Sequence, residues 1–165
     1  QYGGFANSPY LGAADYKMNI KSSSGRGVFT FCMCPGGFVV ASQSEENTIV
    51  TNGMSNFDRA NTNSNAALLV NVNPKDFGSD DVLAGVEFQR KIERKAFICG
   101  GSSYKAPIQC VGDFLKKTNS NRLGEVIPTY KPGVEFCDLN KLFPEYVNNS
   151  IKEAIPVFNK KINYY

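Results

Sequence analysis

Residues 28–42 read "VFTFCMCPGGFVVAS", and this stretch decides how the N-terminal half of the chain folds. Side chains of different character alternate over residues 28–34, which is typical of a β-strand with two unlike faces. The "PGG" at 35–37 favours a tight turn, because proline presets φ and glycine permits positive φ. We therefore predict a hairpin in which residues 38–42 return as the partner strand. The core residues predicted from this alternation are Phe29, Phe31 and Met33.

Shorter strand patterns lie on both sides of this hairpin. Residues 16–20, "YKMNI", alternate so that Tyr16, Met18 and Ile20 share one face. Residues 48–53 predict a short strand that ends at the hairpin-type dipeptide Asn52-Gly53. Residues 66–72, "AALLVNV", predict a further strand before Pro74. The segment 1–74 is therefore predicted to be rich in β-structure.

The second half changes to a helical period. Ser79, Asp80 and Asp81 predict a helix start, since a hydroxyl can cap the first turn and acids favour its positive end. Gly100-Gly101 predicts the end of that helix. Further helices are predicted after Pro107, at Asp138 and over residues 147–162, with a bend or restart at Pro156. The apolar stripe of the first helix comprises Gly85, Phe88, Ile92, Ala96 and Cys99.

This order of elements predicts a single α+β domain over residues 1–165. Its N-terminal half would form an antiparallel or mixed β-sheet or barrel, and residues 75–165 would supply most of the helices. The chain has 42% hydrophobic and 20% charged residues, a net charge of +3 and no apolar run of 18 residues. A protein without a membrane span is therefore expected. Five cysteines, an odd number without framework spacing, predict reduced thiols and a cytoplasmic location.

Cys32 and Cys34 form the most distinctive pair of side chains. A zinc site lacks ligands, because the chain has no histidine and no second cysteine pair at the usual spacing. A disulfide between residues two apart in a strand would be strained, so we predict that the two thiols are not joined. A redox pair is a further and less favoured alternative. Otherwise the pair forms either part of a plain buried hairpin or the wall of an active site.

Familiar catalytic signatures are missing from the sequence. Without histidine the commonest general base is absent, and "GRGVFT" at 25–30 departs from the dinucleotide fingerprint because Thr30 replaces its last glycine. The asparagine-rich stretch 52–65, "NGMSNFDRANTNSN", is either a surface loop or a polar lining for a small anionic ligand. In the second case Arg59 would supply the charged fork.

Four segments resemble one known family. They are "GRGVFTFCMCPGG" at 25–37, "AGVEFQRKIERKAF" at 84–97, "YKAPIQC" at 104–110 and "PTYKPGV" at 128–134. The chain is similar over nearly its whole length to the inserted domain of the uncharacterised FAD-dependent dehydrogenases, the "NAD(FAD)-utilizing dehydrogenases". The resemblance implies a substrate-binding cap domain, excised from a longer flavoprotein and inactive without its FAD-binding domain.

The resemblance also implies cofactor and partners. FAD would belong to the full-length parent and is not expected on this fragment, and NAD(P) is compatible as a second cofactor. The FAD-binding domain of the same chain and a small-molecule substrate would be the partners, with no membrane partner. The rival interpretation is a free-standing module for a polyanion such as RNA, which would use the basic helix at 90–95. We regard nucleic acid as the less favoured partner.

A site follows from combining the resemblance with the two distinctive stretches. Residues 34–37 and 52–59 are predicted to lie side by side, facing the flavin domain, with Arg59 accessible to solvent. Glycine in both stretches would allow close backbone approach to a ligand. The candidates that would face substrate or flavin are Cys34, Pro35, Gly36, Gly37, Asn52, Gly53, Met54, Ser55 and Arg59.

Overall fold

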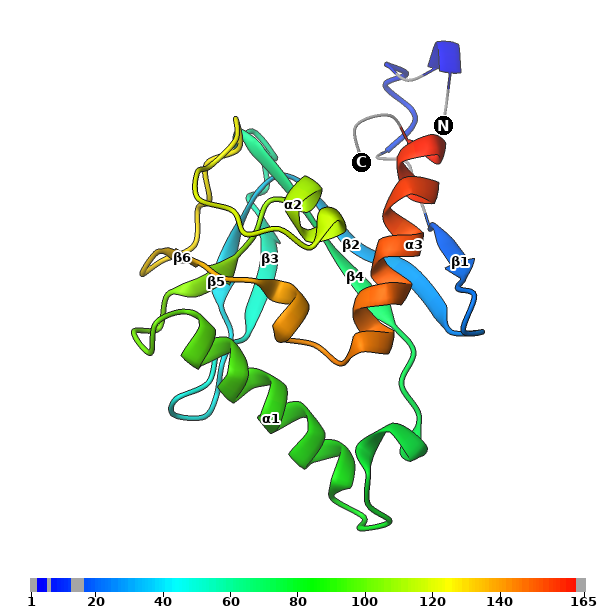
Figure 1. Ribbon diagram of the computed structural model, residues 1–165. Coiled ribbons are helices and arrows are strands. Elements are labelled where there is room, and N and C mark those ends of the chain that lie inside the picture. The colour runs from blue at the N-terminus through cyan, green and yellow to red at the C-terminus, as the bar shows by residue number, and fades with distance from the viewer. Residues whose placement is uncertain (1–2, 6, 13–16, 163–165) are drawn as a thin grey trace.

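The computed structural model describes residues 3–5, 7–12 and 17–162, and it shows the predicted α+β fold with an antiparallel main sheet (Figure 1). The strands are β1 (Asn19–Lys21), β2 (Gly27–Ala41), β3 (Thr51–Ser55), β4 (Asn63–Val70), β5 (Ala106–Ile108) and β6 (Val134–Phe136). The helices are α1 (Ala84–Cys99), α2 (Val111–Lys116) and α3 (Glu145–Lys161), with 3₁₀ turns η1 (Gly3–Phe5), η2 (Pro74–Phe77) and η3 (Leu139–Lys141).

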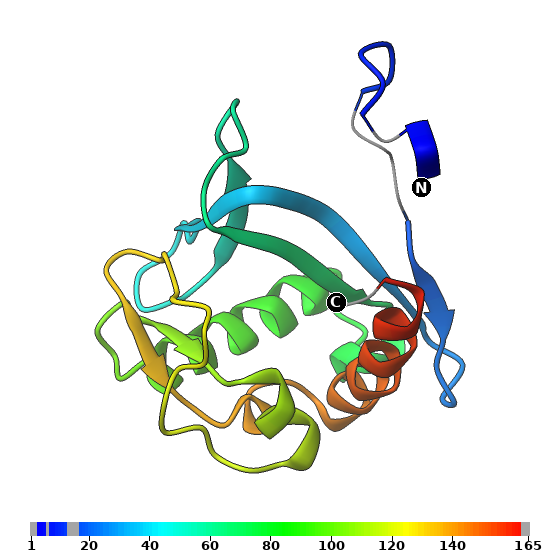
Figure 2. The ribbon, with the colours of Figure 1, turned by 90° about the horizontal axis from the view of Figure 1, so that it is seen from above.

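The long strand β2 organises the sheet. β1 pairs with its first residues, β4 runs along it from Val28 to Gly37, and β3 pairs with its last five residues. All three partners are antiparallel to β2. β2 arches over the rest of the fold, and α1, α3 and the β5–β6 pair gather on its concave side (Figure 2).

The turn predicted at residues 35–37 is wrong, because the chain stays in β2 through the whole "PGG" stretch. Phe31, Cys34 and Gly37 of β2 lie opposite residues 67, 65 and 63 of β4. Each step of three residues along β2 thus matches a step of two along β4, so β2 contains two successive bulges. Cys32 (φ 52°) and Gly36 (φ 54°) adopt left-handed conformations within them. A bulge bends a strand without ending it, so the proline and glycines bend β2 and do not reverse it.

The partner of this segment also differs from the prediction. Residues 37–41 pair with residues 51–55 of β3, and Asn52 and Gly53 lie inside that strand opposite Val40 and Val39. The dipeptide therefore does not stop the strand as predicted. The loop at 56–62 connects β3 to β4, which begins at Asn63, three residues before the strand predicted at 66–72.

The predicted core face of β2 is also wrong. Val28 is fully buried and Thr30 is buried, whereas Phe31 is 61% exposed and Phe29 and Met33 are only half-buried. The alternation itself is present, but both faces of this strand carry apolar side chains. The inward face is set by the packing of α3, which sequence periodicity alone does not show.

The first core cluster joins β1, β2 and β4 to α3. Its buried members are Met18, Val28, Ala154 and Phe158. Ile20 packs against this cluster, so the predicted pairing of Met18 and Ile20 on one face is confirmed. Tyr16, predicted to share that face, lies outside the described residues. α3 runs through Pro156 without restarting.

The second core cluster lies beneath α1 and comprises Ile49, Ala96, Phe97 and Leu142. α1 begins at Ala84, three residues after the start predicted at Ser79, Asp80 and Asp81, and no side chain caps it. The Asp81 carboxylate instead accepts a hydrogen bond from the Leu83 N–H at 2.7 Å, just before the helix. The helix ends where Gly100 follows it, as predicted. A Cβ on residue 100 would overlap the Lys105 carbonyl oxygen, so only glycine fits there. None of the helices described is long and apolar enough to cross a membrane.

Arg26 joins three separate segments. Its guanidinium donates to both carboxylate oxygens of Asp76 in η2, at 2.8 and 2.6 Å, and to the backbone carbonyl of Asn71 at 2.9 Å. It also lies over the ring of Tyr146 at the start of α3, 4.0 Å from the centroid. The hydrogen bond from Arg26 lowers the pKa of Asp76. This cluster therefore fixes β2, η2 and α3 relative to one another.

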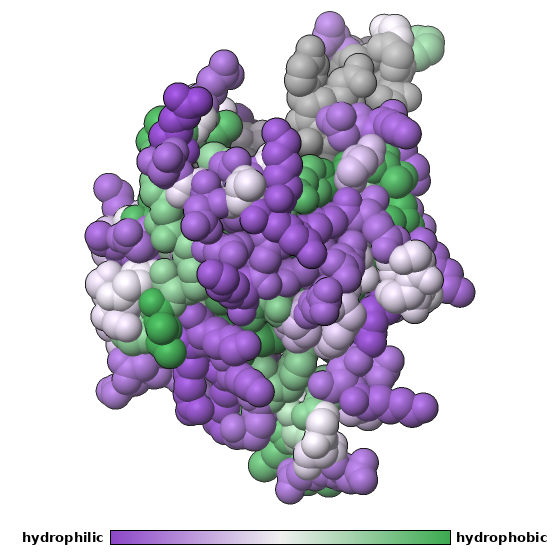
Figure 3. All heavy atoms as spheres, in the orientation of Figure 1, coloured by the Kyte–Doolittle hydropathy of each residue, from purple (hydrophilic) through white to green (hydrophobic). Residues whose placement is uncertain are grey.

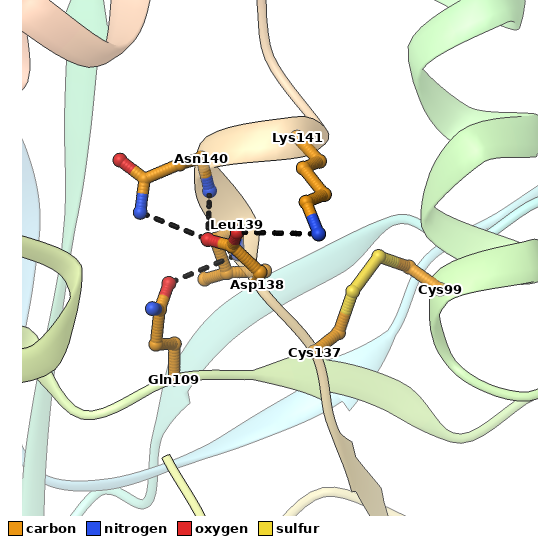
Figure 4. Close-up of a disulfide and its surroundings, with 7 residues drawn as sticks. All are labelled: Cys99, Gln109, Cys137, Asp138, Leu139, Asn140 and Lys141. Atoms are coloured by element: carbon orange, nitrogen blue, oxygen red, sulfur yellow. Dashed lines mark hydrogen bonds and ion pairs between the residues drawn. A yellow bond between two sulfur atoms is a disulfide. The ribbon is translucent and has the colours of Figure 1, made fainter. Parts of the chain in front are cut away.

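The prediction of five reduced thiols is wrong for one pair. A disulfide joins Cys99 at the end of α1 to Cys137, with a Cα–Cα separation of 5.8 Å (Figure 4). The parallel pairing of β5 with β6 brings Cys137 to this place, and 38 residues of sequence separate the two cysteines. Asp138 follows and caps η3 by accepting from the Asn140 N–H, as predicted. Cys32, Cys34 and Cys110 remain free.

Candidate functional site

The two predicted stretches lie side by side in the structure, but as neighbouring strands of one sheet. Gly37 of β2 pairs with Ser55 of β3, and the register continues through Phe38 and Met54. The Ser55 hydroxyl donates to the backbone carbonyl of Pro35 at 2.9 Å. The bulged part of β2 is thus held against the end of β3, and the loop 56–62 closes over both.

All three candidate glycines lie directly against another segment of the protein. A Cβ at Gly36 would overlap the backbone carbonyl of Arg59, and one at Gly37 would overlap that of Met54. A Cβ at Gly53 would overlap the side-chain oxygen of Asn65. Glycine is therefore required at these positions by close approach of protein segments, and this finding accounts for them without a ligand.

Arg59 is exposed and adopts a left-handed backbone conformation, φ 52°. Among the described residues, no ion pair joins Arg59 to an acidic side chain. Its neighbour Asp58 accepts a hydrogen bond from the Ala60 N–H, and Glu45 pairs with Arg90 instead. The guanidinium is therefore available to a ligand or to another part of the protein.

The two cysteines of β2 lie close to this arginine. Their Sγ atoms are 3.9 Å apart, and the Cys34 thiol also lies 3.6 Å from the Cys32 carbonyl oxygen. Burial raises the pKa of Cys34, and Cys32 raises it further. The Ser55 hydroxyl and the positive charge of Arg59 act in the opposite direction on that pKa. The thiols, the hydroxyl and the guanidinium thus belong to one electrostatic environment.

The same segments of the chain carry exposed apolar side chains. Phe31 is 61% exposed, Met54 is 44% exposed and Phe57 at the loop tip is fully exposed. Asn52, the remaining candidate, is exposed on β3 opposite Val40. Large apolar side chains that share a surface with an unpaired arginine are typical of a contact region rather than of a purely solvated one. We call residues 31–37 and 54–59 the bulge surface.

The sequence interpretation missed two asparagines that build this region. The Asn65 side-chain amide lies 3.3 Å from the Phe38 carbonyl and 3.4 Å from the Met54 carbonyl, so it joins β4 to both neighbouring strands. Asn63 donates to the Ile127 carbonyl at 2.7 Å. The sequence does indicate this arrangement, because two asparagines spaced two residues apart in a strand place both side-chain amides on the same face.

Two hollows lie beneath the sheet. A cavity of about 230 Å³ is lined by Gly37, Asn65 and Tyr130, among others. A larger hollow of about 720 Å³ lies between α1 and the sheet, and Thr51, Ala106 and Pro107 line both spaces. The stripe predicted for α1 faces the larger hollow, which is bordered by the apolar side chains Ile49, Leu69, Phe88, Ile92 and Phe143. An apolar ligand of moderate size would fit this volume.

The basic helix proposed for a polyanion is partly neutralised. Arg90 lies within 2.8 Å of Glu45 and 2.7 Å of Glu87, so its charge is already paired. Lys91 and Lys95 border a groove of about 580 Å³ that also contains Asp76, Asp81 and Glu87. Because acidic side chains lie among the basic ones, this surface attracts a phosphate backbone less strongly than the basic residues at 90–95 alone would predict.

The described residues contain no cluster suited to a metal ion, and the first turns of their α-helices are acidic. There is no group of three or more His, Cys, Asp or Glu side chains that could hold a metal there. A pyrophosphate is normally bound at a helix N-terminus that is free of negative charge. The first turns of α1, α2 and α3 contain Glu87, Asp113 and Glu145, whose carboxylates would repel it.

Comparisons with known proteins agree with the flavoprotein resemblance at a coarse level. A family model described as "FAD-dependent protein, C-terminal domain-like" matches residues 1–165. A protein of Clostridium beijerinckii described as "Uncharacterized protein" is 52% identical over 166 residues. That match covers all of this chain and 31% of the relative, so the chain spans about a third of the relative's length.

Proposed function

The chain belongs to the family described as FAD-dependent protein, C-terminal domain-like, and from this premise we propose that it is the substrate-side domain of an FAD-dependent oxidoreductase. The chain corresponds to about a third of its relative, which leaves ample sequence for a separate FAD-binding part. In this proposal the domain covers the flavin and contributes contacts to the substrate. Its arrangement as an insertion within the flavoprotein and its cytoplasmic location stay predictions.

The observation that carries the proposal is the unpaired Arg59 within the bulge surface. Phe31, Met54 and Phe57 of the same segments expose apolar area, which is costly in water and favours a covering partner. A guanidinium at such a contact can bind a carboxylate or phosphate through two parallel hydrogen bonds. The surface therefore suits the FAD-binding part of the same protein together with an anionic substrate or NAD(P).

The residues of this chain would have limited and specific roles in that arrangement. Arg59 would orient the anionic group, and Ser55 would hold the bulged strand in place through Pro35. FAD carries out hydride chemistry when it is bound to its own domain. Because the helix N-termini here do not fit its pyrophosphate, we derive no step of the reaction through FAD.

The experiment compares two arginine variants of the full-length flavoprotein. Arg59→Ala should slow reduction of the bound flavin by NADH or NADPH, measured anaerobically, because a charge-assisted bond is lost. Loss of about 1.5–3 kcal/mol corresponds to roughly 10- to 150-fold in rate. Arg94→Ala, on the exposed side of α1, is the matched control and should leave the rate unchanged. Equal rates for both variants and the wild type would contradict the proposal.

A further inference from the structure

Two free thiols lie unusually close together in the first bulge of β2. Cys32 is exposed, Cys34 is half-buried, and their Sγ atoms are 3.9 Å apart. In a regular strand, residues two apart are displaced by about 6.6 Å along the same face. The bulge therefore brings the two sulfur atoms much nearer to bonding distance than the sequence spacing predicts.

The backbone of Cys32 shows how this approach is achieved. Its φ of 52° is in the left-handed region, where a bulge normally places glycine. The second bulge follows that rule, with Gly36 at φ 54°. At position 32 the chain instead carries a side chain in a conformation that glycine would adopt without strain. A strained residue held by its surroundings is evidence for a role of its side chain.

The surroundings distinguish the two thiols from each other. Cys32 is open to a reagent from solvent, whereas Cys34 is partly shielded. Burial raises the pKa of Cys34 first, and Cys32 adds to the increase, so Cys34 is held as a thiol at neutral pH. Once Cys32 is bonded to another sulfur, that second contribution is removed. Burial still raises the pKa of Cys34 in that state, and the Ser55 hydrogen bond and the charge of Arg59 still act in the opposite direction.

We propose that Cys32 and Cys34 form a dithiol that is reversibly oxidised to an intramolecular disulfide by exchange with an external disulfide. The Cys32 thiolate attacks one sulfur of the external disulfide, forms a mixed disulfide and releases one thiolate. Cys34 then loses its proton and attacks the Cys32 sulfur, which expels the second thiolate. Two protein thiols are thus oxidised, and one disulfide is reduced to two thiols, which take up the two protons.

The product disulfide would close a ring over the single residue Met33. Such a short ring departs from relaxed disulfide geometry, so the bond should be readily reduced again by a monothiol. The remaining cysteines do not offer this chemistry. Cys99 and Cys137 are already bonded to each other, and the Cys110 sulfur is 3.5 Å from the Arg122 carbonyl oxygen. Cys110 is therefore the natural control position.

The test uses the full-length protein, treated with oxidised glutathione, alkylated and analysed by peptide mass spectrometry. The wild-type peptide containing β2 should lose two hydrogens and escape alkylation, and reduced glutathione should reverse the change. Cys34→Ser should retain one glutathione on Cys32, whereas Cys32→Ser should retain about tenfold less, because Cys34 is partly shielded from solvent. Cys110→Ser should form the intramolecular disulfide as the wild type does.

Two results would overturn the inference. One is a wild-type peptide in which Cys32 and Cys34 both remain alkylatable after oxidation. The other is glutathione retained mainly on Cys34, which would reverse the proposed order of attack. The exchange does not involve the flavin or Arg59-dependent turnover. Its outcome is therefore independent of the outcome for the proposed oxidoreductase domain.

Discussion

The backbone carbonyl of Arg59 lies in the space that a side chain on Gly36 would fill. The backbone of Asn61 also donates to the Gly36 carbonyl oxygen at 3.2 Å, so the loop 56–62 is packed directly on the second bulge of β2. This contact holds Arg59 near Cys34 and gives the bulge surface its shape. The geometry at Gly36 should therefore be important for stability as well as for the site.

We expect Gly36→Ala to destabilise the fold strongly. Alanine would be strained at φ 54° and would overlap the Arg59 carbonyl, so about 2–5 kcal/mol of unfolding free energy should be lost. Gly112→Ala is the matched control, because the site is helical and nothing beyond the adjoining residues and backbone of its own helix lies within 4 Å of the added Cβ. That substitution should be neutral or slightly stabilising. Urea denaturation of both variants measures the difference in unfolding free energy. Similar midpoints would contradict the prediction, because they would show that the loop 56–62 can move away from an added side chain at little cost.

The corrected core of the sheet can be tested with two phenylalanines. Phe158 is fully buried in the cluster of α3, whereas Phe31 is 61% exposed on β2. Phe158→Ala should cost about 3–5 kcal/mol of unfolding free energy, the usual range for a buried aromatic. Phe31→Ala should change it by less than about 0.5 kcal/mol, as an exposed substitution does. A large loss for Phe31→Ala would restore the core face predicted from the sequence.

Acid should weaken the cluster of Arg26 and Asp76. The folded pKa of Asp76 is lowered, chiefly by the hydrogen bond from Arg26, so this stabilisation is complete above the ordinary value of 3.8. It is lost as the pH falls through the folded pKa, when the carboxylate is protonated. Asp76→Asn should therefore lower the melting temperature at pH 7 and make little difference at strongly acidic pH. A difference between wild type and variant that does not shrink on acidification would contradict this assignment.

Thiol counting tests the disulfide. Titration of the denatured, unreduced chain should find three free thiols, from Cys32, Cys34 and Cys110. The double variant Cys99→Ser with Cys137→Ser should lose about 3–4 kcal/mol of unfolding free energy, which is the chain-entropy value for a loop of 38 residues. Five titratable thiols would instead support the reduced state predicted from the odd cysteine count. Cys110→Ser serves as the control for serine substitution.

The sequence predicted local features whose causes lie within a few residues. The stripe of α1, its end before Gly100 and the cap at Asp138 depend on helix period and capping, so they were predicted correctly. Whether residues 35–37 form a turn or a bulge depends on their pairing with β4, which lies far along the chain. Pro-Gly-Gly is compatible with a turn and with a bulge, and only the partner strand distinguishes them.

The adjacency of the two stretches was predictable from the sequence, but the contacts that build it were not. Glycine, serine and arginine in 34–37 and 52–59 indicated a meeting of two segments, and the register of Gly37 with Ser55 brings them together. The amide of Asn65 that fills the space over Gly53 comes from a third strand. The disulfide of Cys99 with Cys137 requires the parallel pairing of β5 and β6. Long-range pairings of this kind leave no periodic pattern in one sequence.

The proposed contact between the bulge surface and the FAD-binding part is tested most directly by hydroxyl-radical footprinting of the full-length flavoprotein. Phe57 on the bulge surface and Val82 before α1 are almost equally exposed in this domain, at 105% and 97%. The segment that precedes α1 lies at the lower end of the molecule (Figure 1), where Figure 3 shows apolar residues on a face that is otherwise mostly hydrophilic. With each rate normalised to the denatured chain, we predict that Phe57 is protected and Val82 is labelled freely. Free labelling of Phe57 would contradict the contact.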